Sequence, residues 1–261
     1  MRLLSLSLFL AVSSCLSAQT NLPPLTRAPK AIALAERMLS ANRVQDDLIG
    51  TVIVGTIRLG SKGDPLPIKV YTQGTSRSRT EISQSAGTSI KIHKDGFASF
   101  QPAVGKVVRL NPINTIGGGI NVMPMLSLVR EYASEHLQLE DIGMKSLGNV
   151  SVHQMAVSWS DALGLDDQTE FLKRTRTVYS VDPVTFRILQ LDYDRCAERD
   201  TNVIVHYKIV YSNYRSFGDA LLPSTVTTYT NEAVSSVLEI SDFTSGVTND
   251  PSLFELSGVT K

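Results

Sequence analysis

Apolar and polar residues alternate most clearly in the C-terminal part of the chain. In Val203–Tyr214 the odd positions are mainly apolar or aromatic, while the even positions include His206 and Lys208. Ile204 and Val210 interrupt the pattern. Such alternation is typical of a strand that has one face on a core and the other in water. The pattern therefore predicts a long, half-buried strand here.

Two further strands are expected after it. Gly218-Asp219 predicts a turn, and Leu222-Pro223 predicts the entry to the next strand. That strand covers Ser224–Thr230, which is rich in the Thr, Val and Tyr residues that suit a pleated surface. Asn231-Glu232 then turns the chain into a third strand, Val234–Phe243.

The rest of the chain shows the same kind of pattern. Lys94-Asp95-Gly96 is a strong hairpin signal because Gly supplies a positive φ. The expected strands before Val203 are Leu48–Leu59, Ile68–Gln73, Ser76–Ser83, Thr88–His93, Phe97–Phe100, Lys106–Leu110, one within Ile142–Val157, Thr175–Val181 and Phe186–Tyr193.

Two segments have the spacing of helices instead. In Lys30–Arg43, apolar residues recur at helical intervals and polar residues take another face. Val122–His136 has an apolar stripe after Pro124, which suits a first helical turn. Trp159–Gln168 is polar, contains glycine and is expected to be a loop.

About eleven strands and two helices predict a mainly β protein without an internal repeat. A sheet of this size must curl or close, because open sheet edges favour aggregation. We expect one domain over residues 19–261, formed by a large curved antiparallel sheet.

The order of several landmarks resembles a known family. A strand ending in Tyr211-Ser212-Asn213-Tyr214-Arg215 is followed by Gly218, by Leu222-Pro223, and by Asp250-Pro251 before Phe254. This order resembles the periplasmic LolA/LolB-like lipoprotein-carrier superfamily, whose fold the sigma-factor regulator RseB shares. The resemblance implies an unclosed half-barrel, with an N-terminal helix and an inserted helix that covers its concave side. It also implies an inward arginine, matched here by Arg77 or Arg79.

The N-terminus has the form of a secretory signal. Met1-Arg2 gives a positive end, and an apolar run with small residues follows, too short to span a membrane. Residues 1–18 are therefore expected to be a signal peptide, and the protein to be periplasmic. Val12-Ser13-Ser14-Cys15 also has the form of a bacterial lipobox, so Cys15 is a candidate for lipidation and outer-membrane anchoring. Cleavage after Ala18 is the alternative, and the sequence leaves both open.

The composition and motifs point away from several other functions. Lys+Arg and Asp+Glu are both 25, and the basic residues form no run, which argues against nucleic-acid binding. The four histidines are isolated from one another in the sequence, so no metal-ligand motif is present. No nucleophile or phosphate-loop motif is present either. We expect no enzyme activity, no cofactor and no metal.

The expected function is therefore binding rather than catalysis. An apolar hollow in the sheet would hold acyl lipid or a lipoprotein, and a donor or acceptor protein in the inner or outer membrane would exchange it with a monomeric carrier. Alternatives are an envelope-stress sensor of the RseB type that binds lipoprotein and a membrane-protein partner, or an anchored structural β domain. The candidate cavity residues are Ile53, Ile57, Val70, Arg79, Ile82, Ile92, Met125, Leu128, Val129, Leu189, Leu191, Val205, Tyr207 and Ile209. For the apolar residues the alternative is plain core packing, which their pattern favours position by position; for Arg79 it is a solvent-facing position on its strand.

Overall fold

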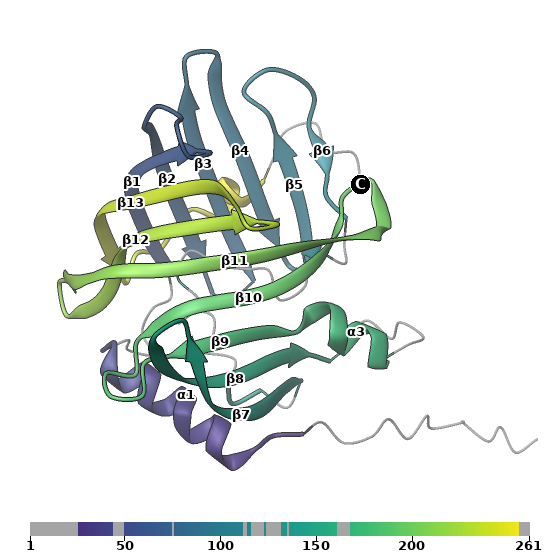
Figure 1. Ribbon diagram of the computed structural model, residues 1–261. Helices are drawn as coiled ribbons and strands as arrows, with labels where there is room; N and C mark the ends of the chain where they lie inside the picture. The colour runs from purple at the N-terminus through teal and green to yellow at the C-terminus, as the bar shows by residue number, and fades with distance from the viewer. Residues whose placement is uncertain are drawn as a thin grey trace, which may run out of the picture.

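The protein forms one large antiparallel sheet in a computed structural model (Figure 1). The structure describes residues 26–43, 50–74, 76–111, 114–115, 123, 132–134, 136–160 and 168–255. Its elements are α1 (Pro29–Ala41), β1 (Gly50–Leu59), β2 (Leu66–Gln73), β3 (Arg77–Gln84), β4 (Gly87–Lys94), β5 (Phe97–Gln101), β6 (Val108–Arg109), β7 (Leu137–Leu147), β8 (Val150–Trp159), α3 (Gln168–Thr175), β9 (Thr177–Val181), β10 (Ile188–Ala197), β11 (Asp200–Phe217), β12 (Ala220–Thr230), β13 (Ala233–Ser245) and the 3-10 helix η2 (Pro251–Phe254).

The sheet is curved but does not close. Its strand order is β6-β5-β4-β3-β2-β1-β13-β12-β11-β10-β9-β8-β7, so β6 and β7 are edges among the described strands. Neighbouring strands pair antiparallel throughout, and β1 joins the two ends of the chain by pairing with β13. The expected fold class, a curved and unclosed antiparallel sheet with an N-terminal and an inserted helix, is confirmed.

Residue register defines the concave face of this sheet. Ile53 of β1 lies opposite Val70 of β2 and Phe243 of β13. Leu191 of β10 lies opposite Ile209 of β11. These side chains belong to one buried cluster, although their strands lie far apart in the sheet. The sheet must therefore curl so that one face covers a shared interior.

Helix α1 lies on this concave face near β7. Its buried residues Ala31, Leu34, Ala35 and Met38 recur at helical spacing and join the same cluster as Leu139 of β7. Pro29 stands in the first turn, where a missing N–H costs nothing. Asn42 ends the helix, and its side chain donates to Met38 O at 2.6 Å. The predicted N-terminal helix is confirmed, with ends that differ by one or two residues.

The turns form for the predicted reasons. Asp95 and Gly96 both have positive φ, at 49° and 83°, and link β4 to β5. Asn231 and Glu232 also adopt positive φ and link β12 to β13. Pro223 was expected at a strand entry, but it lies inside β12 opposite Tyr214.

The inserted helix differs from the expected one. Helix α3 packs against β8 and β10, just after the segment that the sequence pattern marks as a polar loop. The helix expected over Val122–His136 lies mainly outside the described residues. Of it, Met123 is buried in the core, and Tyr132 and His136 lie in turns.

Candidate ligand-binding cavity

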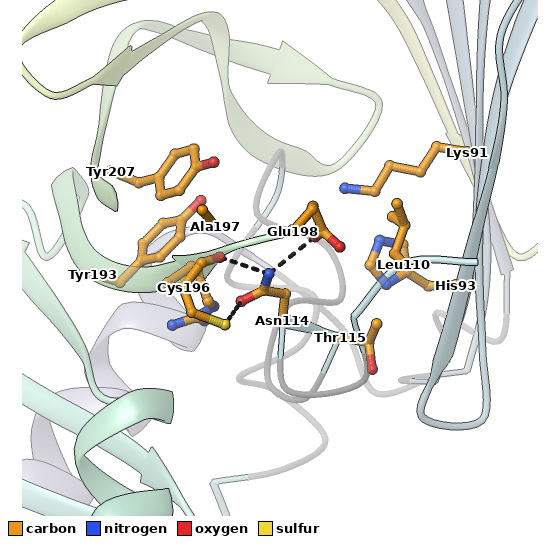
Figure 2. A pocket seen from close by; sticks show the side chains of 11 residues that line it. Lys91, His93, Leu110, Asn114, Thr115, Tyr193, Cys196, Ala197, Glu198 and Tyr207 are labelled. Atoms are coloured by element: carbon orange, nitrogen blue, oxygen red, sulfur yellow. Dashed lines mark hydrogen bonds between the residues drawn. The ribbon is translucent and has the colours of Figure 1, made fainter. Parts of the chain in front are cut away.

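A cavity of about 160 Å³ opens on the concave face between β4 and β10–β11. Lys91 and His93 of β4 line one wall, and Tyr193 and Tyr207 line the opposite wall (Figure 2). Six strands separate β4 from β10 in the sheet. The curvature of the sheet therefore brings the two walls together, and no local sequence pattern does so.

Two stacked tyrosines form the β10–β11 wall. Tyr193 and Tyr207 lie directly opposite in the strand register, and their rings stack with centroids 5.3 Å apart and planes 9° apart. The Arg195 guanidinium lies 4.6 Å from the centre of the Tyr193 ring, a cation–π contact. Burial and the negative charge of Glu198 raise the pKa of Tyr207, so its hydroxyl keeps its proton. This wall offers flat apolar rings edged by hydroxyl groups.

The β4 wall carries two basic side chains in an enclosed setting. Lys91 is reached by solvent because the cavity is open, but protein surrounds it. This enclosure lowers the pKa of Lys91, and the charge of Glu198 partly opposes the shift. Burial, and then the charge of Lys91, lower the pKa of His93 to about 3. His93 is therefore neutral at physiological pH.

Asn114 and Thr115 lie near both walls of the cavity. The Asn114 side chain donates to Glu198 Oε1 at 3.0 Å and to Cys196 O at 2.8 Å (Figure 2). The Thr115 hydroxyl donates to Gly96 O at 2.6 Å, in the turn that follows β4. These contacts join Asn114 to β10 and its following turn, and Thr115 to the turn after β4. Cys196 is buried with a free thiol.

Arg195 is the most enclosed cation of the cavity. It is 7% exposed, and its Nη1 donates to Arg174 O at 3.0 Å and to Asp194 O at 2.7 Å. Its Nη2 is buried and has no hydrogen-bond partner within the described part of the chain. The Asp194 carboxylate makes no salt bridge with Arg195 and accepts from His206 Nδ1 at 2.9 Å, so its charge acts on Arg195 only from a longer distance.

Comparison with solved structures shows the fold to be a known one. A LolA superfamily protein from Nitrosomonas europaea has a TM-score of 0.56 and 14% identity, over 87% of this chain and 97% of that one. A structure from Vibrio parahaemolyticus, assigned as an outer membrane lipoprotein-sorting protein domain, has a TM-score of 0.55 and 12% identity over the same shares. The protein has a LolA-like fold. A DUF1329 family protein from Desulfovibrio piger shares it, with a TM-score of 0.54 and 14% identity over 88% of this chain and 98% of that one.

By sequence alone, no family model and no curated protein matches the chain. At such low identity the LolA-like fold does not by itself establish a function. Within the described ranges, no helix is both long and apolar enough to cross a membrane. No group of three or more metal-ligating side chains comes together among those residues either.

Most of the apolar candidates lie on the concave face of the LolA-like sheet. Ile53, Ile57, Val70, Leu191 and Ile209 are buried in the shared cluster. Ile82 packs against it. Tyr207 lines the cavity, and Val205 lies opposite Arg195 at the same end of the sheet. Leu189 is half-buried next to an irregularity in the pairing of β10 with β9.

Two candidates lie on the convex face. Thr80, not Arg79, is opposite Val70, so Arg79 points away from the hollow, and Ile92 lies opposite Arg79. Helix η2 packs on β3 and β4 over this convex face, and Arg79 Nη1 donates to Leu253 O at 2.8 Å. Arg79 thus ties the C-terminal turn to the outside of the sheet.

The remaining candidates lie outside the described residues. They are Met125, Leu128 and Val129 for the cavity and Cys15 for lipidation.

The sequence interpretation did not identify Lys91, His93 or Arg195 as site residues. For Arg195 a signal was present, because it interrupts the inward phase of β10, which also holds Leu191 and Tyr193. The inward phase of β4 is polar, with Ser89, Lys91 and His93, so alternation did not single out Lys91 or His93. Strands on the two sides of a curved sheet cannot be matched from the sequence alone, so their meeting was not foreseeable.

Proposed function

We propose that the protein is a periplasmic binding or carrier protein that holds the acyl chains of lipids or lipoproteins against the concave face of its sheet. The observation that carries the proposal is one continuous apolar face that ends at an open cavity. Ile53, Leu191 and Ile209 come from three different strands of this face. The likeness to a lipoprotein-sorting domain and to a LolA superfamily protein supports the same class of ligand.

Acyl chains suit this face energetically. Each buried methylene contributes about 0.8 kcal/mol. The cavity of about 160 Å³ at the end of this face is lined mainly by polar side chains and has room for one small chemical group. A whole acyl chain needs more room, so binding requires the apolar side chains of this face to move apart. Release then follows when a tighter acceptor competes for the chain.

The proposal includes a partner and a place. A monomeric carrier without a cofactor would take its ligand from a donor protein in one membrane of the envelope and deliver it to an acceptor in the other. No catalytic step is required for this exchange.

The test uses protein purified from its own cell envelope. Native mass spectrometry should detect a bound acyl lipid or lipopeptide, and delipidated protein should bind a fluorescent fatty acid at one saturable site. Ile82→Glu places a charge on the apolar part of the concave face, opposite Ile68, and it should weaken binding about tenfold or more because a carboxylate is costly to bury. Met144→Glu, at an exposed position on β7, should leave binding unchanged. A folded protein that carries no lipid and binds no fatty acid would refute the proposal.

A further inference from the structure

A buried cation without a salt bridge in the described part of the chain lies at the polar end of the concave face. Arg195 is 7% exposed, and its Nη2 has no partner within the described part of the chain. A guanidinium stays charged in proteins, and a buried charge is costly unless it is paired. The contacts that Arg195 does make are to two backbone carbonyls and to the face of Tyr193, and none of these supplies a negative charge. The guanidinium therefore has the capacity to bind an anion.

The rest of the cavity supports the same conclusion. Lys91 reaches into it from the opposite wall (Figure 2). Glu198 is the single carboxylate among the described lining residues, and it accepts hydrogen bonds from Asn111 N at 2.6 Å and from the Asn114 side chain. With His93 neutral, two cations face one carboxylate, so the cavity has a net charge of about +1. Tyr207 adds a hydroxyl donor on the β10–β11 wall, which also carries Arg195.

A second cavity shares Asn114 and Cys196 with the first one. It also measures about 160 Å³, and Arg195 lines both cavities. Lys173 and Arg174 also line the second one, where Asp194 is the single carboxylate among the described lining residues. The positive field at Arg195 therefore extends beyond one cavity wall.

We propose that Lys91 and Arg195 form a binding site for a phosphate group, which we assign to the headgroup of a lipid whose acyl chains lie on the adjoining apolar face. This assignment deepens the proposed function and rests on it. A phosphate group is small enough for a cavity of about 160 Å³. Its several oxygens can accept from a guanidinium, an ammonium and a hydroxyl at once. The ligand would thus be amphiphilic, with its apolar part toward Leu191 and Ile209 and its anionic part toward Arg195.

The test compares soluble short-chain lipids that differ only in the phosphate. Isothermal titration calorimetry would measure the binding of dihexanoyl phosphatidic acid, of dihexanoylglycerol and of inorganic phosphate. The wild-type protein should bind the phosphatidic acid about ten- to a hundredfold more tightly than dihexanoylglycerol, as expected for charge-assisted hydrogen bonds. Arg195→Met and Lys91→Met should each lose most of this preference and keep their affinity for dihexanoylglycerol.

Matched controls lie on the convex face. Arg58→Met on β1 and Lys69→Met on β2 remove the same charges from side chains that point away from the hollow, and the preference should persist. The two cavity variants test the site independently, so a folding defect in one does not decide the result. A circular dichroism spectrum and an unfolding transition establish that each variant is folded.

The outcomes separate this site from the acyl-chain proposal. Equal wild-type affinity for both lipids would refute the phosphate site and leave acyl binding intact. A preference that survives both cavity variants would refute it too. Inorganic phosphate that binds as tightly as the phosphatidic acid, and is lost in both variants, would confirm the site but assign it to free phosphate. Binding of none of the three would refute both proposals.

Discussion

The concave face has an apolar part and a polar part that are built on the same strands. Leu191 and Ile209 pair in the middle of β10 and β11 and are almost completely buried. Four residues further along, the same register pairs Arg195 with Val205, and the inward position holds a cation instead of an apolar side chain. The alternation is identical in both parts. The difference shows that the alternation of a strand defines which residues face inward, while their individual chemistry decides between core and binding site.

The largest expected effect on stability comes from creating a cavity in the apolar part. Leu191→Ala should lower the free energy of unfolding by about 2–5 kcal/mol, because Leu191 is 0% exposed and its methyl groups would leave a cavity in the shared cluster. Urea unfolding followed by circular dichroism would measure this loss. Val184→Ala, at a site that is 82% exposed, should change stability by less than about 0.5 kcal/mol. A loss below about 1 kcal/mol for Leu191→Ala would mean that the apolar face is not tightly packed there.

The polar part should have a distinct pH dependence. The pKa of His93 is lowered to about 3, while in the unfolded chain it takes its usual value near 6.5. Between these values the unfolded chain binds the extra proton, so stability is complete above about pH 6.5 and falls as the pH falls. In the wild type, His93 should account for about 2 kcal/mol of the decrease in the free energy of unfolding between about pH 6.5 and 4.5, and His93→Gln should lack this part of the decrease. Chemical unfolding at several pH values would measure it.

A neighbour on the same strand provides the control for His93. Ser89→Ala changes a buried, non-titrating side chain on the same face of β4 and should retain the wild-type pH dependence. The carboxylates whose pKa values are lowered by hydrogen bonds, Asp95 and Asp182, lose their contribution only at lower pH, below their usual value near 4. If wild type and His93→Gln lose stability equally over the stated range, His93 is not enclosed as described.

Local sequence features predicted most of the fold. The hairpin at Asp95-Gly96 follows from the need for positive φ, and α1 follows from apolar residues at helical spacing. Helix α3 was missed, because its eight residues contain few apolar side chains and follow a polar segment. Such a short helix is stabilised by its packing against β8 and β10, which the sequence does not reveal.

The site could be predicted only in part. Period-two alternation identified the apolar face that includes Ile53, Val70 and Ile209. It could not show that β4 faces β10 across six intervening strands, because that contact depends on the curvature of the whole sheet. The family resemblance predicts an inward arginine at Arg77 or Arg79, whereas one residue of register puts Thr80 on the concave face instead.

The smallest expected effect comes from the charge at the open side of the polar part. The pKa of Lys91 is lowered by its enclosure, so the folded protein holds this ammonium less favourably than water does. Lys91→Met removes that cost and shortens the side chain by only one atom. It should raise the free energy of unfolding at pH 7 by less than about 1 kcal/mol, since solvent still reaches Lys91 and screens its charge. Wild-type stability should rise as the pH increases through the lowered pKa toward the usual value, and the variant should lack this rise.

The control for Lys91→Met is Lys69→Met on the convex face, which should change stability by less than about 0.5 kcal/mol. A loss of more than about 1 kcal/mol in Lys91→Met would instead mean that Lys91 and Glu198 form a stabilising ion pair, and that the polar end of the hollow serves to hold the two walls together.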